Sequence, residues 1–537
     1  MLVGRANERE PNNVYSVCLA ISITYFRGLA TNLMKCLIAD SVLITESSSH
    51  EGGALMGLGP KHKKRVWYTA AIGGIAGITG LTTLGVMTGM TPASSPSQSK
   101  DRQAAAAKTL ARPAMDGGAK KDGGAKKDAV EIGCDADELI QAIIDANDGG
   151  GTIKLAADCT YNLTRYKLDD EFNEPVGLPE IEDQITIKGH NSTIQRDASA
   201  DPFRIFDVDT GGHLTLKNVA VKYGDARNVG LITSEGGGGL LVEDGGKATL
   251  ENTKFAFNRT DSFGGAIANY GITKFVGSGE HGKDAVSSSD TWADSGGKDG
   301  TGKSSGDIHD NSADDSGGAI YNDGYLDVKK ARIAYNNAEF GGAIYNITVA
   351  KLTKTEVDHN FAHFEGGAIY TDEIAKLKES YVHDNTSGDS IGGGIYNFDQ
   401  LYLEKTNLTR NFAEFDGGGV YNDGEAAQFA ANESKINQNT SREDGGGIFN
   451  FEGQVGLTNS EVNNNKAVGP NSNGGGIYNF GDGFVRLSDT QVNENLSTNE
   501  PGGVRNAIGE VELAGDSEII KNRPTNCGPA EIEGCFG

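Results

Sequence analysis

The 537-residue sequence predicts an all-β solenoid, a chain that repeats one small coil of strands along an axis. The first observation is a Gly-Gly-(Ala/Gly)-aliphatic step that occurs nine times between Gly237 and Asn479, most often as GGAIYN or GGGIYN. From Gly317 onward, the first glycines of successive steps are 24 to 29 residues apart. The second observation is a column of asparagines with the same period. A fixed period in this range indicates a supersecondary unit stacked on copies of itself.

Composition and charge narrow the possible functions. Only 37% of the residues are hydrophobic and 76 are glycine, whereas a globular α/β enzyme of this length carries more apolar residues and fewer turn formers. The net charge is −26, and the excess of positive charge is concentrated in residues 61–128. The repeats are therefore strongly acidic and repel nucleic acid and anionic lipid. We expect no nucleic-acid partner.

Residues 66–91 are expected to form a transmembrane anchor or a signal segment. The 24 residues Trp67–Met90 carry no charge and are long enough to span a bilayer. A basic run, Lys61–Arg65, precedes them and is expected to stay cytoplasmic. Everything after the anchor is then extracellular or lumenal, or secreted if cleavage occurs near Ala93–Ser97. A buried helix is the alternative for this segment. For residues 1–60, the alternatives are a second targeting element at Val14–Phe26 and a translation start at Met56.

Two further segments precede the repeats. Residues 1–65 are expected to form an N-terminal cytoplasmic segment of open role. Residues 92–130 are rich in Ser, Ala, Gly and Lys, and repeat GGAKKD at Gly117–Asp122 and Gly123–Asp128. Such a composition cannot bury enough apolar surface to fold, so we expect a flexible cationic linker.

The folded domain is expected over residues 131–537 and opens with a short helix. Ala136–Asn147 has apolar residues at helical spacing and an acidic first turn, and Gly149–Gly151 ends it. Thr152–Leu155 then alternates like a strand. A helix in this place is expected to cover the first coil, whose strand edges are otherwise unpaired.

This segment resembles the N-terminal cap of the pectin-lyase-like right-handed parallel β-helix, and the likeness continues through Ile185–Gly189, Phe203–Val208 and Leu214–Val221. From about Gly237 to Asn522, the GGA(I/V) and FxxN pattern resembles the repeats of polymorphic outer-membrane proteins, which are β-helical adhesins and autotransporter passengers. These resemblances imply a single-stranded right-handed parallel β-helix. At the inter-strand spacing of a sheet it has roughly 13 coils and a length on the order of 60 Å.

Two columns of asparagine run through the repeats. In the first, an aliphatic or aromatic residue is followed three positions later by Asn258, Asn311, Asn336, Asn360, Asn385, Asn411, Asn439, Asn465, Asn495 and Asn522. The second column ends the glycine step and contains Asn269, Asn322, Asn346, Asn397, Asn422, Asn450, Asn479 and Asn506. Stacked Asn side chains hydrogen-bond from coil to coil, and Asn tolerates the left-handed backbone of a tight turn. We therefore expect structural Asn ladders at the turns.

The glycine step also predicts an aromatic column. Because side chains alternate along a strand, Ile is expected to point inward and Tyr outward. The outward column is Tyr321, Tyr345, Tyr370, Tyr396, Tyr421 and Tyr478, with Phe449 as a substitute. Such rings either stack on a ligand or only stabilise the sheet. Residues 277–306, rich in Ser, Gly and Asp, are expected to form one inserted surface loop.

Cysteines bracket the folded domain at both ends. Cys134 and Cys159 lie at its start, and Cys527 and Cys535 at its end, as expected of two disulfides formed in an oxidising compartment. The first would contribute roughly 3 kcal/mol. Nine Asn-X-Ser/Thr sequons begin at Asn162, Asn191, Asn258, Asn346, Asn385, Asn407, Asn432, Asn439 and Asn495. In a secreted eukaryotic protein, some of them would carry glycans.

No catalytic residue and no cofactor is predicted, although the same fold houses polysaccharide hydrolases, lyases and epimerases. A hydrolase needs paired carboxylates about the glycosidic bond, and the Asp314–Asp315 pair falls in a turn. Tyr223–Arg227 resembles an epimerase motif but lacks the Pro and His that continue it. Solvated turn residues are the preferred interpretation of His281, His309, His359, His363 and His383. Candidates for weak Ca²⁺ binding are Glu365, Asp416 and Asp444.

We therefore expect a membrane-anchored extracellular or lumenal protein that recognises a polysaccharide or a cell-surface protein without catalysis, as an adhesin does. A polysaccharide lyase or epimerase is the alternative, and a structural component of a surface or wall is the third possibility. An enzyme predicts Asp, Lys, Arg or His side chains converging in one groove from neighbouring coils. An adhesin predicts a regular face without such a cluster.

Overall fold

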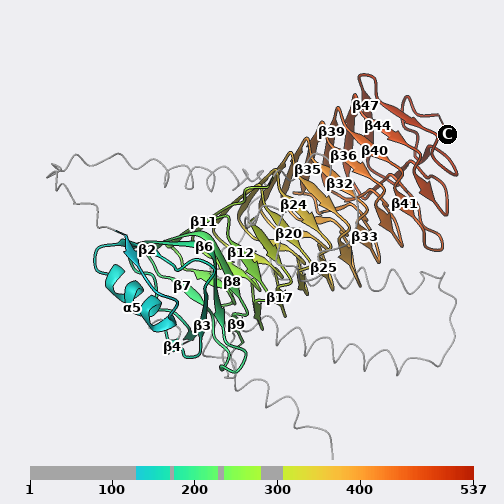
Figure 1. Cartoon of the computed structure of the whole chain (residues 1–537). Helices are drawn as coiled ribbons and strands as arrows, with labels where there is room; N and C mark the ends of the chain where they lie inside the picture. Colours follow the sequence, from blue (N-terminus) through green and yellow to red (C-terminus); the bar gives the residue numbers. More distant parts are fainter. Residues whose placement is uncertain (1–128, 170–173, 228–234, 280–305, 537) are drawn as a thin grey trace, which may run out of the picture. The chain divides into compact units, whose positions relative to one another are not determined.

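The computed structural model describes residues 129–169, 174–227, 235–279 and 306–536 (Figure 1). The expected cytoplasmic segment, the expected membrane segment and nearly all of the expected linker lie outside the described residues. No helix within the described ranges is long and apolar enough to cross a membrane.

The described chain is an all-β, right-handed parallel β-solenoid of about 13 turns, as the period of the sequence predicts (Figure 1). A complete coil contributes four short strands in a fixed order, and each strand pairs in parallel with the equivalent strand of the next coil. We number these four positions columns 1 to 4 in chain order.

The strands of each column are as follows. Column 1 contains β2 (Gly151–Lys154), the first halves of β6 (Gln184–Arg196) and β8 (His213–Lys222), β11 (Lys247–Glu251), β15 (Ile272–Val276), β19 (Tyr325–Lys329), β23 (Val349–Thr353), β27 (Ile374–Lys378), β31 (Gln400–Glu404), β35 (Gln428–Asn432), β39 (Gln454–Thr458), β43 (Phe484–Ser488) and β47 (Glu510–Ala514). Column 2 contains β3 (Thr160–Leu163), the second halves of β6 and β8, β12 (Lys254–Ala256), β16 (Asp307–His309), β20 (Arg332–Ala334), β24 (Glu356–Asp358), β28 (Tyr381–His383), β32 (Asn407–Thr409), β36 (Lys435–Asn437), β40 (Glu461–Asn463), β44 (Gln491–Asn493) and β48 (Glu518–Ile520).

The other two columns are shorter. Column 3 contains β9 (Asp225–Ala226), β13 (Arg259–Thr260), β17 (Ser312–Ala313), β21 (Asn337–Ala338), β25 (Phe361–Ala362), β29 (Thr386–Ser387), β33 (Phe412–Ala413), β37 (Thr440–Ser441), β41 (Lys466–Ala467) and β45 (Leu496–Ser497). Column 4 contains β7 (Phe206–Val208), β10 (Leu240–Val242), β14 (Ile267–Asn269), β18 (Ile320–Asn322), β22 (Ile344–Asn346), β26 (Ile369–Thr371), β30 (Ile395–Asn397), β34 (Val420–Asp423), β38 (Ile448–Phe451), β42 (Ile477–Phe480), β46 (Val504–Asn506) and β49 (Cys527–Pro529). Outside the columns, β1 (Val130–Glu131) pairs with β2, and β4 (Lys167–Leu168) pairs with β5 (Pro175–Val176).

The register stacks like residues on like residues. In column 4, Ile320 pairs with Ile344, which pairs with Ile369. All three are buried in one hydrophobic core that runs through the solenoid. Tyr321, the next residue after Ile320, lies outside that core. The Ile of the step therefore points inward, whereas Tyr321 lies outside the hydrophobic core and is nevertheless buried.

Glycine is required twice in each step, for two reasons. The first Gly of all nine steps has a positive φ, between 57° and 70°, a conformation that glycine adopts without steric cost. The second Gly lies where coils approach one another closely. A Cβ on Gly318 would lie 2.3 Å from the carbonyl oxygen of Gly342, so no larger residue fits.

The left-handed residue of the turn before column 3 is not the ladder Asn, contrary to the sequence-based expectation. It is the residue before it, and its φ is 56° at Tyr335, 53° at His359 and 56° at Arg410. A left-handed residue other than glycine costs roughly 1–2 kcal/mol. The stacked coils fix the turn, so any residue type at this position must adopt that conformation.

The first Asn column forms a continuous ladder. Asn411 Nδ2 donates to Asn439 Oδ1 in the next coil (3.0 Å) and to the Val382 carbonyl oxygen in the preceding coil (3.0 Å). Its own Oδ1 accepts from the backbone N–H and the Nδ2 of Asn385 (3.1 and 3.0 Å). The same pattern links every member of the column.

Two further ladders run beside it. In the second Asn column, Asn422 Nδ2 donates to Asn450 Oδ1 (2.7 Å). The other ladder consists of hydroxyls and follows column 1. The Thr406 N–H donates to Ser434 Oγ (3.1 Å), and the Ser434 N–H donates to Ser460 Oγ (3.1 Å). This ladder was not predicted from the sequence, where its signal is a Ser or Thr two residues after most column 1 strands.

Both predicted disulfides are present. Cys134 and Cys159 are joined with a Cα–Cα distance of 5.7 Å, and Cys527 and Cys535 with one of 6.5 Å. The first joins the segment before the helix to the start of column 2, and the second closes a loop after the last coil.

The described chain also has the expected helix, α5 (Ala136–Ala146). Asp135 caps it, because its side chain accepts from the Asp137 N–H and the Glu138 N–H (2.7 and 3.3 Å). Leu139 and Ile143 are buried in the hydrophobic core of the solenoid, where α5 contacts β2, β3 and β6.

The insertion at residues 277–306 interrupts a single coil. It separates β15 in column 1 from β16 in column 2, and residues 280–305 lie outside the described ranges. The ladder continues across it, because Asn258 Nδ2 donates to Asn311 Oδ1 (3.0 Å).

Candidate binding surface

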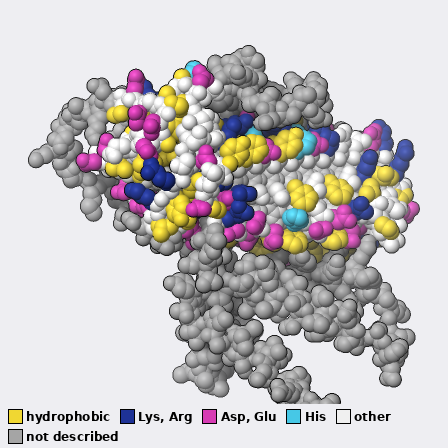
Figure 2. Space-filling model, turned by 60° about the horizontal axis from the view of Figure 1, so that its bottom comes forward, with side chains coloured by type: hydrophobic (Ala, Val, Ile, Leu, Met, Phe, Trp, Pro, Cys, Tyr) yellow, Lys and Arg dark blue, Asp and Glu magenta, His cyan; other side chains and the backbone are white. Residues whose placement is uncertain are grey.

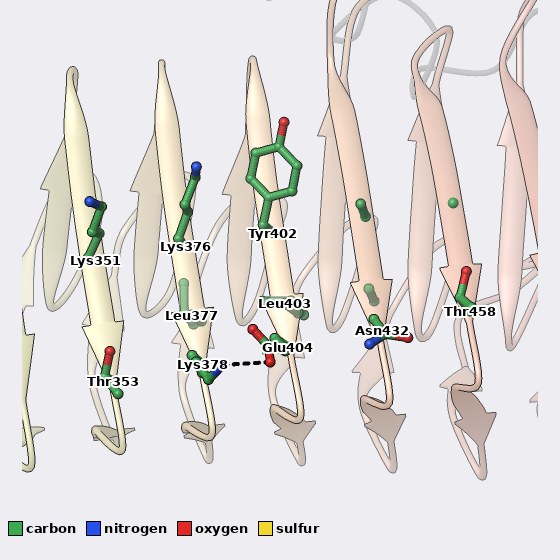
Figure 3. A pocket seen from close by; sticks show the side chains of 13 residues that line it. Lys351, Thr353, Lys376, Leu377, Lys378, Tyr402, Leu403, Glu404, Asn432 and Thr458 are labelled. Carbon is green, nitrogen blue, oxygen red and sulfur yellow. Dashed lines mark hydrogen bonds and ion pairs between the residues drawn. The ribbon is translucent and has the colours of Figure 1, made fainter.

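A shallow groove of about 560 Å³ crosses the outer face of column 1 from β23 to β39 (Figure 3). The strands form it because alternate side chains point to opposite faces. In β31, Leu401 and Leu403 are buried inside, whereas Tyr402 stands on the outer face. The residues paired in register with Tyr402 on the next two coils are Ala430 and Gly456.

The small residues make the floor of this groove. A Cβ placed on Gly456 would meet no atom within 4 Å, so the space above this residue is open. Tyr402 stands beside this floor, and its hydroxyl donates to Gln400 Oε1 (3.0 Å). One edge of a flat floor is therefore formed by an aromatic ring, an arrangement that accommodates a flat, partly apolar ligand.

Two lysines line the groove on the other side of Tyr402. The Lys351 Nζ lies 5.1 Å from the centre of the Tyr325 ring, and the Lys376 Nζ lies 5.1 Å from the centre of the Tyr402 ring. Both are cation–π distances. Neither lysine pairs with a carboxylate of the described residues, whereas Lys378 at the edge of the groove binds Glu404 (2.6 Å). We call the groove lined by Lys351, Lys376, Tyr402, Ala430, Asn432 and Gly456 the Lys–Tyr groove.

The two lysines lie on the surface of an acidic protein. The chain as a whole has a net charge of −26, and charged side chains of both signs are mixed over the face that Figure 2 shows. Some lysines elsewhere on the surface pair with carboxylates of neighbouring coils, as Lys435 does with Glu461 (3.1 Å). The Lys–Tyr groove therefore offers two cations that an external anion can pair with.

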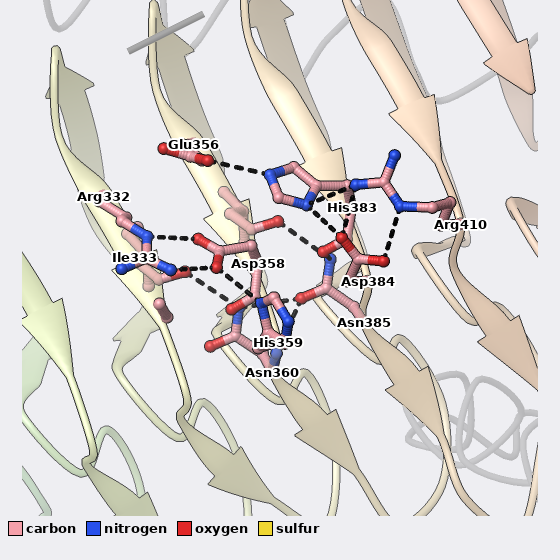
Figure 4. Close-up of polar contacts among 12 residues, drawn as sticks. Arg332, Ile333, Glu356, Asp358, His359, Asn360, His383, Asp384, Asn385 and Arg410 are labelled. Carbon is pink, nitrogen blue, oxygen red and sulfur yellow. Dashed lines mark hydrogen bonds and ion pairs between the residues drawn. The ribbon is translucent and has the colours of Figure 1, made fainter. Parts of the chain in front are cut away.

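A second cluster of charged side chains lies on the outer face of column 2 (Figure 4). His383 is central to it. Its Nε2 lies 3.0 Å from Glu356 Oε1, and its Nδ1 lies 2.7 Å from Asp384 Oδ2. Arg410 binds both oxygens of Asp384 (2.8 and 2.6 Å). In the adjoining coil, Arg332 binds both oxygens of the buried Asp358, which also contacts His359 Nδ1 (2.8 Å).

The hydrogen bonds within this network determine the protonation states of His383 and Asp384. Burial alone would lower the pKa of His383, but hydrogen bonds to Asp384 and Glu356 raise it to about 9. Burial alone would raise the pKa of Asp384, but hydrogen bonds to His383 and Arg410 hold it well below its usual range. His383 is therefore an imidazolium at neutral pH, and the surrounding charges balance one another.

This network has the geometry of a structural cluster rather than a catalytic one. A buried imidazolium that donates from both nitrogens has no lone pair with which to act as a base. Ligand atoms of Glu356, Asp358 and His383 lie within 4.8 Å of one another. A metal ion would have to displace the proton on His383 Nε2 and compete with the Arg332 guanidinium. The residues do not fit a metal site.

The Tyr column is largely enclosed. Tyr321, Tyr396 and Tyr478 are buried. Neighbouring rings stack face to face, with centroids 4.4 Å apart for Tyr345 and Tyr370, and 4.7 Å apart for Tyr370 and Tyr396. Because neighbouring rings occupy these faces, the geometry is that of a stabilising stack and leaves little ring surface for a ligand.

The other candidate catalytic residues from the sequence each make local contacts and do not converge on one site. The backbone amides of Asp314 and Asp315 bond to the preceding coil in a turn. Asp225, in the epimerase-like segment, is enclosed by Arg227 and Arg259 (2.7 Å each). Burial would raise the pKa of Asp225, but hydrogen bonds from these two arginines lower it.

The histidines do not converge on one point. His309 Nδ1 contacts its neighbour Asp310 (2.5 Å), and His363 packs edge-on against Phe361 (5.0 Å). His359 and His383 contribute to the charged network described above. His281 lies outside the described residues.

The carboxylates before the glycine steps are also separate. Asp416 Oδ1 accepts from the Asp444 N–H (2.8 Å), and Asp444 Oδ1 accepts from the Asn473 N–H (2.8 Å). Glu365 is buried, and burial raises its pKa to about 7. In the described part of the chain, these three carboxylates do not gather into a group that would hold an ion.

Comparison with known proteins found no match to the chain among protein-family models, curated proteins or solved structures.

Proposed function

We propose that this protein recognises an anionic polysaccharide without catalysis, and that it does so through the Lys–Tyr groove. The observation that carries this proposal is the pair of lysines beside Tyr402 and the open floor at Gly456. An aromatic ring stacks on the apolar face of a sugar, and the two ammonium groups pair with acidic substituents of adjacent sugars. Coils stacked at about 4.8 Å allow one extended chain to contact several of them.

The location is part of the same proposal. We propose that residues 66–91 anchor the chain in a membrane and that the solenoid is extracellular or lumenal. The two disulfides support exposure of the solenoid to an oxidising compartment. The relation to pectin-lyase-like proteins and to polymorphic outer-membrane protein repeats is likewise proposed, on the sequence patterns alone.

The test is retardation of the full-length protein in gels that contain polygalacturonate. We expect retardation by polygalacturonate and none by neutral dextran. Lys351→Ala and Lys376→Ala should each weaken binding about tenfold. Lys435→Ala is the matched control, because this lysine pairs with Glu461 on column 2. Equal retardation of all four proteins would reject the groove as the binding site.

The same incubation separates the proposal from the enzymatic alternative. A lyase acting on polygalacturonate produces unsaturated uronates, which absorb ultraviolet light, whereas a binding protein produces none. A rise in absorbance would therefore show that the protein is a lyase and would reject the proposal of recognition without catalysis. Retention of neither polymer would instead favour a structural component of a surface or wall.

A further inference from the structure

The fold divides the nine glycosylation sequons into two groups. Five of their asparagines are ladder members, at most 1% exposed, namely Asn258, Asn346, Asn385, Asn439 and Asn495. The other four lie at the surface or partly at the surface, namely Asn162, Asn191, Asn407 and Asn432. The sequence motif is the same in both groups, so only the folded structure distinguishes them.

Asn432 stands out among the surface group because it lines the Lys–Tyr groove (Figure 3). It is the last residue of β35 and is exposed. In the register of column 1 it lies between Glu404 and Thr458. Its backbone carbonyl accepts from the Lys405 N–H (3.0 Å), which fixes the main chain and leaves the side chain outside the ladders.

Asn439, seven residues later in the same coil, provides the contrast. Its Nδ2 donates to the Leu408 carbonyl oxygen (3.0 Å) and to Asn465 Oδ1 (3.1 Å). Its Oδ1 accepts from the backbone N–H and the Nδ2 of Asn411 (both 3.0 Å). A sugar on Nδ2 would replace one of these donated hydrogens and would have no space, because the residue is fully buried.

We propose that Asn432 is an acceptor for an N-linked glycan and that this glycan closes the Lys–Tyr groove. The closure rests on the proposed function of the groove, whereas the modification does not. In the transfer, Asn432 Nδ2 bonds to the anomeric carbon of an oligosaccharide carried on a lipid diphosphate. The bond from that carbon to the diphosphate oxygen breaks, the diphosphate leaves with the electron pair, and Nδ2 gives one proton to a base of the transferase.

Glycosylation of a ladder asparagine is incompatible with folding of the solenoid. A transferase that acts during translocation meets the chain before its coils have stacked. A glycan added to Asn439 at that stage prevents the adjoining coils from forming their hydrogen bonds, which leaves buried groups unsatisfied. Folded molecules therefore carry glycans only at the surface group of sequons.

The first experiment maps the glycans on the full chain made in a eukaryotic secretory host. Glycans are released enzymatically in heavy-oxygen water, which marks each former site as a labelled aspartate, and peptides are identified by mass spectrometry. We expect the label at Asn432 and none at Asn439 in the soluble, folded fraction. Label at ladder asparagines is expected only in aggregated material. An unmodified Asn432, or a labelled Asn439 in the folded fraction, would overturn the proposal.

The second experiment measures groove closure by retardation in polygalacturonate gels. Protein made in bacteria, without glycans, is expected to bind, and glycosylated protein to bind about tenfold more weakly. Asn432→Gln is made in both hosts, so that its bacterial form controls for the substitution itself, and the two forms should bind equally. Failure of the unglycosylated protein to bind would reject the function of the groove and leave the modification to the peptide map. Equal binding by the glycosylated and bacterial forms of the wild type, or a tenfold difference between the two forms of Asn432→Gln, would reject the closure.

Discussion

Glu365 and His383 are buried titratable groups of opposite charge type that respond to pH in the same direction. Burial raises the pKa of Glu365 to about 7, above its ordinary value of 4.5. The pKa of His383 is raised to about 9, above its ordinary value of 6.5. Each group therefore binds its proton more tightly in the folded chain than in the unfolded chain. Folding is stabilised wherever those protons are present and loses stability as the pH rises.

For Glu365, the loss of folding stability occurs between pH 4.5 and about pH 7. Replacing it with the neutral Glu365→Gln should remove that dependence and stabilise the protein at pH 8, by at most about 3 kcal/mol. Thermal unfolding measured from pH 4 to pH 8 checks this. Glu404→Gln, on the surface, serves as the control. A variant curve parallel to wild type would contradict the burial argument.

For His383 the stabilisation is complete below pH 6.5 and is lost by about pH 9. His383→Gln should abolish this slope and destabilise the protein at pH 6, where the imidazolium network is fully formed, by about 3 kcal/mol. Unfolding in denaturant at pH 6 and at pH 9.5 gives the measurement. The difference between the two proteins should nearly disappear at the higher pH, and a constant difference would show that packing rather than charge is lost.

At the scale of the element, the turn is specified by stacking more than by its own residues. Tyr335, His359 and Arg410 adopt a left-handed conformation that their side chains disfavour. The bonds of each ladder Asn to both neighbouring coils hold the turn in place. The ladder therefore helps to hold this turn in its left-handed conformation.

Asn411→Ala tests the ladder. It removes the acceptor of the Asn385 backbone N–H, one acceptor of Asn385 Nδ2 and one donor to the Val382 carbonyl oxygen, and should destabilise the protein by about 3 kcal/mol. Asn432→Ala, the same substitution on the outer face, should change the stability by less than about 0.5 kcal/mol. Denaturant titration of both variants compares them directly, and similar losses would refute a special role of the ladder.

Features that recur in nearly every coil, such as the core and the Asn ladders, could be predicted from the sequence. Features that depend on how particular coils stack could not. The inward direction of Ile320 and the ladder at Asn411 follow from a period, which one chain displays many times over. The left-handed residue was misplaced because the local preference of Asn was taken as decisive, whereas stacking decides. Lys351, Lys376 and Tyr402 occupy one position of the repeat on successive coils, but the residue type at that position changes along the chain, so only the register of the coils shows that they share a groove.

At the scale of the whole molecule, each coil contacts mainly its neighbours, so stability is approximately a sum of local terms. The core and the two Asn ladders continue through the coil with the insertion between β15 and β16. The two disulfides act at the ends of this array. Their effects should accordingly remain close to those ends.

Replacing Cys134 and Cys159 together with serine should therefore loosen only the first coil. The expected cost is about 3 kcal/mol for a loop of this length. Hydrogen exchange should accelerate in α5, β2 and β3 and stay unchanged in β27 to β39. Uniform acceleration along the chain would show that the solenoid unfolds as a single cooperative unit.

The residue-for-residue register of column 1 has a consequence for how such a protein changes. The core and the ladders are formed by inward-facing residues and by turn residues. Each outward-facing position, defined by its coil and its place on the strand, therefore takes no part in them. Substitutions at these positions change the side chains on the outer face without changing how the coils stack. The outer face is in this sense a lattice of exchangeable sites, and a different ligand requires only different occupants of the same lattice.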